Sequence, residues 1–384
     1  MADSELLAAR RILERHPVLD GHNDLPIALR EEGLAGPGVP RGYDPAVADV
    51  TGPLAGTHTD VPRLREGGVG GQFWSVFVDA ALAGEKAVTA TLEQVDLVRT
   101  MIATHPDAFA FAGSADDVER AFSDGRIASL IGMEGGHSID SSLGALRMFA
   151  ALGARYMTLT HNDNTPWADS ATDEPAVGGL TDFGREVVRE MQRLGMLVDL
   201  SHVAPTTMHA ALDVARAPIL FSHSSCRALA DHPRNVPDEV LARVVANGGV
   251  VMITLVPMFL SDAAAAWSRA AQEEMRADGL DPDDWNVATR FMAERESRAP
   301  FPHVTVSDVA DHVDHARRVM GPDHVGIGGD YDGVHILPRG MEDVRGYPHL
   351  FAELLRRGWS EDELAGFACR NAIRVLRAAE DAAG

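Results

Sequence analysis

Short apolar runs alternate with amphipathic stretches along most of this chain, and each kind of segment predicts its own kind of element. We predict one strand that starts at Val18 and seven others at 72–78, 127–134, 155–161, 196–202, 218–223, 248–256 and 325–330. We predict helices between them, including 90–104, 141–152, 181–194, 206–215, 237–246 and 308–320. Short continuous apolar strands that alternate with helices are typical of parallel strands buried on both faces. Eight such units predict an α/β fold of the TIM-type (β/α)8 barrel, with a doubly wound open sheet as the alternative.

Several segments fall outside this alternation. The segment 259–303, rich in Ala, Glu and Arg, follows the seventh strand, so in a barrel it would lie on the catalytic rim. We expect it to form a helical lid or a wall of the substrate site, or alternatively a peripheral or dimer contact. We also predict helices at 3–16, 59–66 and 364–379, the last after a capping box at Ser360, an irregular loop from 27 to about 53, and a glycine-rich turn at 67–71. No linker of domain size interrupts the sequence, so residues 1–384 are predicted to form a single domain.

The composition narrows the range of partners and compartments. The net charge is −23, from 34 basic and 57 acidic residues, which argues against nucleic acid and anionic membranes as partners. The two cysteines, Cys226 and Cys369, are too few for a disulfide scaffold or a cysteine-rich zinc site, and we expect buried thiols. The first residues are charged and amphipathic and lack the apolar core of a signal peptide, so we expect a cytoplasmic protein, with secretion by another route as the alternative.

Metal-ligand and acid–base residue types stand where the predicted strands end. These residues are His22, Asp24, Glu134, His161, His202, His223, Asp330 and Asp332. In a barrel, the C-terminal ends of all strands open on one face, so these side chains would converge. One such histidine is usually an ordinary polar residue, but the repetition at equivalent positions predicts a functional site.

The residue types in this set indicate a chemistry. Even three imidazoles and two carboxylates from this set are too many ligands for one four-coordinate zinc ion that keeps an open position. They fit two metal ions with a bridging carboxylate. Two metals lower the pKa of bound water from about 15.7 to about 7 and polarise a carbonyl oxygen, which predicts hydrolysis at a carbonyl or phosphoryl centre. Redox chemistry is not predicted, because the glycines at 326–329 match a dinucleotide fingerprint poorly.

Longer motifs carry a resemblance to a known family. They are DGHNDLP at 20–26, GGVGGQFWSVFV at 67–78, GMEGG at 132–136, LTHNDNTPWADS at 159–170, LVDLSHV at 197–203, SHSS at 222–225, RNVPDE at 234–239 and GIGGDYDGV at 326–334. The chain thereby resembles the membrane (renal) dipeptidases, the zinc dipeptidases of the amidohydrolase-like barrel group (peptidase family M19). The motifs are long, varied and in order over nearly the whole chain, so the resemblance is specific.

The resemblance implies a metal-binding role for five residues. His22 and Asp24 would hold one zinc ion, and His202 and His223 would hold the other. Glu134 would bridge the two ions together with a hydroxide. Two Zn²⁺ per subunit and a homodimer are what the resemblance implies.

It also implies roles toward a dipeptide substrate. Asp330 would deliver the proton of the attacking hydroxide to the departing amine, which must be protonated to leave. His161 would stabilise the oxyanion, and Arg234 would pair with the free C-terminal carboxylate, a task suited to its planar fork. The expected activity is hydrolysis of dipeptides, L,D-dipeptides included, by attack of the hydroxide on the peptide carbonyl.

Some assignments remain open at this stage. Asp332 competes with Asp330 as the proton shuttle, and Asp330 is preferred because it is the first acid after the strand. Asp20 and Asn23 are expected to orient ligands. Val256 stands near where the mammalian pattern has a tyrosine that contacts substrate, so the preferred side chain is not predicted. The alternative functions are an amidohydrolase of the same fold for another amide, a lactone or a deaminase-type substrate, and a catalytically inactive binding protein.

Overall fold

Parallel strands form the centre of the molecule. A computed structural model describes residues 2–31, 44–45, 48–82, 84–282 and 284–384. The strands pair in the order β1-β2-β4-β5-β6-β7-β8-β9, and the short β3 pairs with β4. Their bounds are β1 Val18–Asn23, β2 Val69–Phe77, β3 Phe109–Phe111, β4 Ile127–Glu134, β5 Ala154–Thr158, β6 Leu197–Asp199, β7 Leu220–Ser224, β8 Val250–Ile253 and β9 Val325–Ile327. All eight predicted strands are present, which confirms the prediction of a TIM-like barrel.

Backbone hydrogen bonds join the first strand to the segment that follows the last one, so the barrel is nearly closed. The Asp24 N–H donates to the Tyr331 carbonyl at 2.8 Å, and the Asp330 N–H donates to the His22 carbonyl at 3.1 Å. Closure therefore places Asp24 and Asp330, which lie near opposite ends of the sequence, beside one another at the same end of the barrel.

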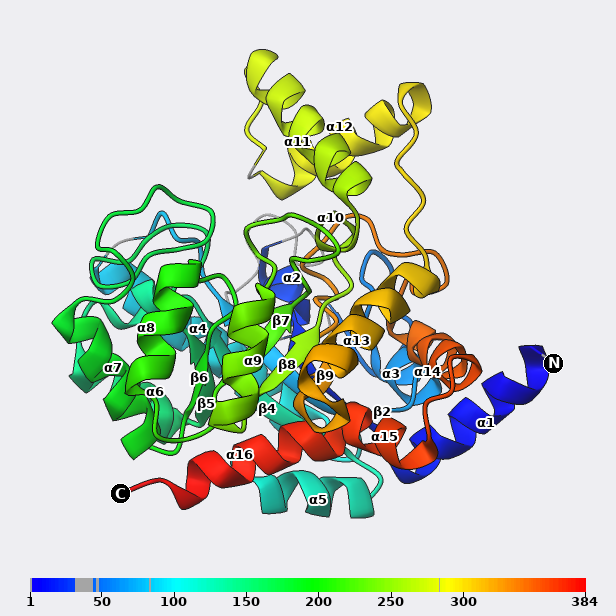
Figure 1. Cartoon of the computed structure of the whole chain (residues 1–384), viewed down its shortest axis with the longest axis horizontal. Coiled ribbons are helices and arrows are strands. Elements are labelled where there is room, and N and C mark those ends of the chain that lie inside the picture. The colour runs from blue at the N-terminus through cyan, green and yellow to red at the C-terminus, as the bar shows by residue number, and fades with distance from the viewer. Residues whose placement is uncertain (1, 32–43, 46–47, 83, 283) are drawn as a thin grey trace.

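Helices cover the outside of the barrel and the end at which the strands begin. Apart from α10 to α12, which form the insertion described below, they are α1 Ala2–Arg15, α2 Leu25–Glu31, α3 Val61–Glu66, α4 Glu85–Thr104, α5 Ala115–Ser123, α6 Leu143–Leu152, α7 Asp182–Arg193, α8 Pro205–Val214, α9 Asp238–Asn247, α13 Val306–Met320, α14 Tyr347–Arg356, α15 Glu361–Ala365 and α16 Asn371–Asp381. The predicted capping box is present, because Ser360 and Glu363 exchange hydrogen bonds at the start of α15. The predicted closing helix is two helices, α15 and α16, joined by a π-helical turn at Gly366–Arg370. Figure 1 shows α16 lying across the lower end of the barrel, beside α5.

Two predictions of irregular structure were wrong in part. The loop expected from residue 27 to about 53 begins as helix α2, residues 32–43 and 46–47 of it lie outside the described part of the chain, and residues 48–53 are irregular as predicted. The expected glycine-rich turn already contains the start of β2. A Cβ on Gly71 would lie 2.6 Å from Leu19 Cδ1, so this glycine permits close approach of β2 to β1. The elements β3, α5 and α14 were not predicted.

The helical insertion after the seventh barrel strand, β8, is confirmed. It comprises α10 (Pro257–Leu260), α11 (Asp262–Ala277) and α12 (Trp285–Arg298). Figure 1 shows α11 and α12 standing away from the barrel. They share a small apolar core of their own, built on Trp267, Ala271, Met275, Ala288 and Phe291. The insertion is thus a subsidiary unit with its own apolar core. It follows β8 through α10, and Thr289 of α12 is also hydrogen-bonded to His335.

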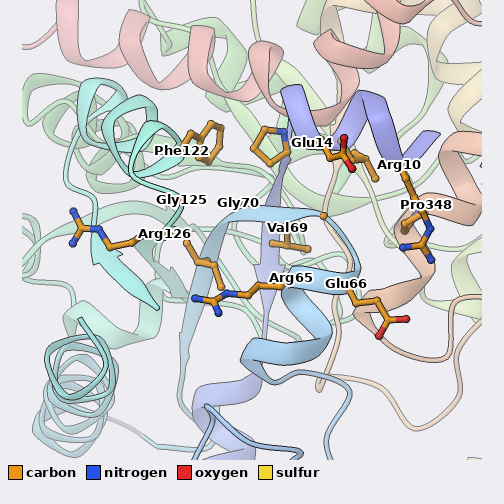
Figure 2. Close-up of a pocket in the computed structure, with 14 residues that line it drawn as sticks. Arg10, Glu14, Arg65, Glu66, Val69, Gly70, Phe122, Gly125, Arg126 and Pro348 are labelled. Carbon is orange, nitrogen blue, oxygen red and sulfur yellow. The ribbon is translucent and has the colours of Figure 1, made fainter. Parts of the chain in front are cut away.

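A pocket of about 310 Å³ lies at the opposite end of the barrel, where β2 and β4 begin. Figure 2 shows arginine and glutamate side chains around it, contributed by α1, α3 and the turn after α5. None of the predicted site residues lines this pocket, so it is separate from the chemistry at the other end. Among the described helices, none combines the length and apolarity needed to cross a membrane.

Candidate metal centre

Four histidines surround the carboxylate of Glu134, which lies at the C-terminal end of β4. The Oε2 atom is 3.3 Å from His22 Nε2. The other oxygen, Oε1, is 3.1 Å from His202 Nε2, 3.6 Å from His223 Nε2 and 3.8 Å from His161 Nε2. The two oxygens of one carboxylate therefore face two different groups of side chains, one containing His22 and the other containing the three remaining imidazoles, which is the arrangement that a bridging ligand requires.

Asp24 completes the first of these groups. Its Oδ2 atom is 3.3 Å from His22 Nε2, so His22 Nε2 lies between two carboxylates. His22, Asp24 and Glu134 present ligand atoms within 4.8 Å of one another, and so do Glu134, His202 and His223. The structure thus brings together the five residues predicted as metal ligands, although their roles as ligands stay a prediction.

Tyr156 fixes the orientation of the His22 ring. The Tyr156 hydroxyl donates to the Gly21 carbonyl at 3.1 Å, so it accepts the hydrogen bond from His22 Nδ1 at 2.8 Å. Nδ1 then carries a ring proton, and Nε2 faces the carboxylates. Burial opposes a charge on this ring, but Tyr156, Glu134 and Asp24 raise the pKa of His22 well above its ordinary value, so Nε2 attracts a proton or a cation. Gly132 makes room for this tyrosine, because a Cβ there would lie 2.1 Å from the Tyr156 ring.

A second relay orients His223. Its Nδ1 atom is 2.8 Å from Ser222 Oγ, and the serine hydroxyl donates to Asp199 Oδ2 at 2.5 Å. Since that hydroxyl gives its proton to the carboxylate, it accepts from His223 Nδ1–H, which leaves the Nε2 lone pair free toward Glu134. A carboxylate or hydroxyl behind the distal nitrogen is the usual support of a metal-binding imidazole.

The charges around Glu134 suit metal binding. Burial alone would raise the pKa of Glu134, but the imidazoles around it, His22 and His202 foremost, lower it well below its ordinary value. Burial, assisted by nearby cationic groups, lowers the pKa values of His202 and His223 well below the ordinary value. An ionised carboxylate and neutral imidazoles are the protonation states that bind a metal ion.

Two further features show that a cation fits here. His22 Nε2 and Asp24 Oδ1 are buried and have no hydrogen-bond partner among the described residues, which is costly unless something else satisfies them. In addition, His202 Nε2 and His223 Nε2 face one another at 2.9 Å, and two nitrogen atoms at this distance need a proton or a cation between them. Histidine and carboxylate donors around such a space match the ligand preferences of zinc.

The positions of Asp330 and Asp332 distinguish the two candidate proton shuttles. Asp330 Oδ1 is 4.0 Å from His22 Nε2, and burial together with Asp24 and Glu134 raises the pKa of Asp330 to about 8 against the attraction of His22. Asp332 instead accepts a hydrogen bond from the His58 backbone N–H at 2.5 Å. Only Asp330 therefore adjoins the candidate ligands, whereas Asp332 is bonded to a neighbouring loop.

The backbone is strained at several of these positions. Non-glycine residues with positive φ include His202 (70°), Asp330 (59°) and Asp332 (66°). Residues held in the left-handed region cost free energy and are found preferentially at functional sites. Of these three, His202 and Asp330 belong to the cluster around Glu134, whereas Asp332 is bonded to the neighbouring loop.

His161 has the most exposed side chain of the four histidines around Glu134, at 15%. Its ring packs edge-on against Phe77 with centroids 4.8 Å apart. Burial lowers the pKa of His161, so its imidazole is neutral and keeps an N–H to donate. This is the property that an oxyanion-stabilising group needs.

Arg234 is a buried cation without an anionic partner among the described residues. It is 3% exposed, and its hydrogen bonds, to Ser224 Oγ at 3.5 Å and to the His223 carbonyl at 3.3 Å, are long. Burial lowers its pKa to about 10, and Asp330 and Glu134 act in the opposite direction. An unpaired buried guanidinium is costly, which makes it a receptor for a carboxylate brought by a ligand.

The hydrogen bonds that Asp20 and Asn23 form with described residues go to groups other than the imidazole rings. Asp20 accepts hydrogen bonds from the backbone N–H groups of His22 and Gly329, and Asn23 bonds to Thr59 and to the Leu25 N–H. They hold the backbone around β1 rather than the ligand side chains.

The residues that orient the rings were missed in the sequence. They are Tyr156, Asp199 and Ser222, together with Ser75, whose hydroxyl donates to Glu134 Oε2 at 2.9 Å. A signal was present, because polar residues inside buried strands need partners.

Comparison with known proteins identifies the family. Residues 6–384 match the model of the membrane dipeptidases, peptidase family M19. The chain belongs to this family. An uncharacterized dipeptidase of Schizosaccharomyces pombe is 41% identical over 97% of this chain and 83% of that protein, and dipeptidase 3 of Macaca fascicularis is 41% identical over 97% of this chain and 67% of that protein. The prediction of a metal-dependent dipeptidase is therefore confirmed at the level of the family.

Solved structures share the fold. The dipeptidase AC, a metallopeptidase of family M19, is 25% identical with a TM-score of 0.76, covering 94% of this chain and 98% of that one. The probable dipeptidase PvdM from Pseudomonas aeruginosa has a TM-score of 0.82 at 22% identity, covering 99% and 100%. A metallopeptidase from Rhodobacter sphaeroides, with a TM-score of 0.76 at 24% identity over 94% and 99%, was solved with a phosphinate mimic of the dipeptide L-Ala-D-Ala.

Proposed function

We propose that this M19 dipeptidase is a binuclear zinc enzyme that hydrolyses dipeptides with a free C-terminal carboxylate. The observation that carries the proposal is the arrangement of Glu134, whose oxygens face His22 on one side and His202 with His223 on the other. Arg234 lies in the loop that follows β7, the strand that carries His223. Its buried, unpaired guanidinium supports a substrate with a carboxylate.

The residues of the chain divide the reaction between them. Two metal ions at Glu134 would supply an activated water and polarise the scissile carbonyl. Asp330 takes the proton from that water and gives it to the amine nitrogen as the C–N bond breaks. His161 donates its N–H to the carbonyl oxygen, on which charge develops. Arg234 holds the C-terminal carboxylate and so fixes the distance between the peptide bond and the metals.

The test combines metal analysis with a substrate panel on one preparation. The panel contains L-Ala-L-Ala, L-Ala-D-Ala, the amide of L-Ala-L-Ala and an N-acetylated alanine. We expect two zinc ions per chain and turnover of the free dipeptides well above that of the other two compounds. Preferential turnover of the N-acetylated compound would contradict the proposal and support an amidohydrolase with another substrate. Absence of turnover with two zinc ions bound would indicate an inactive binding protein.

Glu134→Gln is the variant that tests the bridging position. Because His22 lies on one side of this carboxylate and His202 and His223 lie on the other, its loss should weaken both metal sites. Loss of only one zinc ion would contradict a bridge.

The state and location of the enzyme belong to the same proposal. We propose a homodimer, as the resemblance implies, and a location in the cytoplasm. Sedimentation measures the first, and fractionation of the source cells measures the second. A monomer, or recovery outside the cytoplasmic fraction, would contradict them.

A further inference from the structure

Phe259 joins the helical insertion to Arg234. The residue belongs to α10, the first turn after β8, and its side chain is buried at 8% exposure. The guanidinium carbon of Arg234 lies over the Phe259 ring, 5.2 Å from its centroid. An aromatic face stabilises a cation without using any of its N–H donors, so those donors remain available to a ligand.

This contact matters because Arg234 is otherwise weakly held. Its two side-chain hydrogen bonds measure 3.3 and 3.5 Å, and no ion pair fixes it among the described residues. The Phe259 ring is therefore a principal constraint on where the guanidinium lies.

The Phe259 ring is itself firmly positioned. Asn235, the neighbour of Arg234, donates from Nδ2 to the Phe259 carbonyl at 2.7 Å and to the Ala230 carbonyl at 2.9 Å. The His232 ring packs on Phe259 with centroids 4.5 Å apart. The loop that carries Arg234 is thus bound to the first turn of the insertion through the Asn235 hydrogen bond and through the packing of the His232 ring.

A third element anchors the same turn. His312 of α13 accepts from the Cys226 N–H at Nδ1, so Nε2 carries the proton and donates to the Leu260 carbonyl at 3.2 Å. The end of β7, helix α10 and helix α13 therefore meet at this point. The insertion begins on a rigid base, as a wall of a binding site needs.

We propose that Phe259 is a positioning residue for carboxylate recognition, and that through it the insertion forms the wall of the substrate's C-terminal subsite. The proposal rests on the proposed function, because it assigns the carboxylate to Arg234. Phe259 acts through Arg234 and holds its guanidinium in place, so it should influence binding of the free carboxylate and not the chemical step.

The experiment compares Phe259→Leu with wild type on L-Ala-L-Ala and on the amide of the same dipeptide. A cation–π contact of about 0.5–2 kcal/mol corresponds to an increase in KM of about 2- to 30-fold for the dipeptide. We expect kcat, zinc content and the kinetics on the amide to stay unchanged. Phe259→Tyr retains the aromatic face and should restore the wild-type KM.

The chain offers a matched control in Phe291. It is also 8% exposed, lies in the same insertion, and has an arginine over its ring, with Arg298 at 5.8 Å. Phe291→Leu should leave KM for the dipeptide unchanged. An equal increase in both leucine variants would mean general loosening of the insertion and would overturn the proposal.

A double-mutant comparison separates this inference from the proposed function. Arg234→Gln should raise KM for the dipeptide, and in that background Phe259→Leu should add nothing. If Arg234→Gln leaves KM unchanged, the carboxylate role of Arg234 fails and the inference fails with it. If Arg234→Gln raises KM but Phe259→Leu has no effect, or acts equally on the amide, only the role of Phe259 is refuted.

Discussion

Replacing Tyr156 with phenylalanine removes one hydroxyl group from behind one candidate metal ligand. That hydroxyl accepts from His22 Nδ1 at 2.8 Å and donates to the Gly21 carbonyl at 3.1 Å, in a fully buried position. Phenylalanine keeps the ring that fills the space beside Gly132. The variant therefore leaves packing intact while His22 loses the partner that fixes its tautomer.

The expected loss is specific to one metal. Removing the partner behind a metal-binding histidine typically weakens metal affinity 10- to 100-fold, which is about 1.4–2.7 kcal/mol. Only the zinc ion assigned to His22 and Asp24 should be affected, because His202 and His223 do not contact Tyr156. Titration of the metal-free protein with zinc against a competing chelator should show one weakened site and one unchanged site.

The control is Tyr331→Phe. Its hydroxyl donates to the Met341 carbonyl at 3.2 Å, and the residue is also fully buried. This variant loses a comparable buried hydrogen bond, at a cost of about 1–3 kcal/mol in stability, but both zinc affinities should be retained. Unchanged zinc binding in Tyr156→Phe, or equal weakening in the two variants, would refute the reasoning.

Three further predictions follow from the same structure. Ser222→Ala breaks the relay behind His223 and should weaken the other zinc site 10- to 100-fold in the same titration, so an unchanged second affinity would count against it. Asp330→Asn, in which asparagine tolerates the φ of 59°, should retain both zinc ions and lose about 10²- to 10⁴-fold in kcat, and wild-type turnover would exclude the proton shuttle. Hydrogen bonds from arginines on α6 and α7 lower the pKa of Glu190 to about 2 from 4.5. That stabilisation is complete above the unfolded-state pKa and is lost as pH falls toward the folded value. Since the arginines are about half exposed, Glu190→Gln should lower the free energy of unfolding by about 1 kcal/mol near neutral pH and leave it unchanged near pH 2. Urea unfolding of the metal-free protein measures this difference, and a cost that does not depend on pH would contradict this origin.

The sequence predicted the barrel because its strands are short, apolar and separated by amphipathic helices, a pattern set by burial on both faces. It also predicted where His22, Asp24 and Glu134 would meet, because the C-terminal ends of all the strands lie at the same end of a barrel. Those inferences needed only local periodicity and one geometric rule.

Other features depend on contacts that no local pattern specifies. Tyr156 resembles an ordinary core aromatic in its strand, and its role follows only from the approach of β1 to β5 across the barrel interior. Asp199 and Ser222 stand out as polar residues in buried strands, yet the sequence does not say that they bond to one another. The strand β3 is three residues long, too short for periodicity to indicate it.

The insertion illustrates the same limit. Its helical composition was evident, but the packing of Phe259 on Arg234 joins segments that follow different strands. Such a contact is decided by how α10 folds back over the end of β7.

The most direct test of the two-metal arrangement is a crystal structure of the zinc-loaded protein, with anomalous scattering recorded at the zinc edge. Two anomalous peaks should flank the Glu134 carboxylate, one bound to His22 and Asp24 and the other to His202 and His223. A single peak, or two peaks that do not share Glu134, would contradict the account.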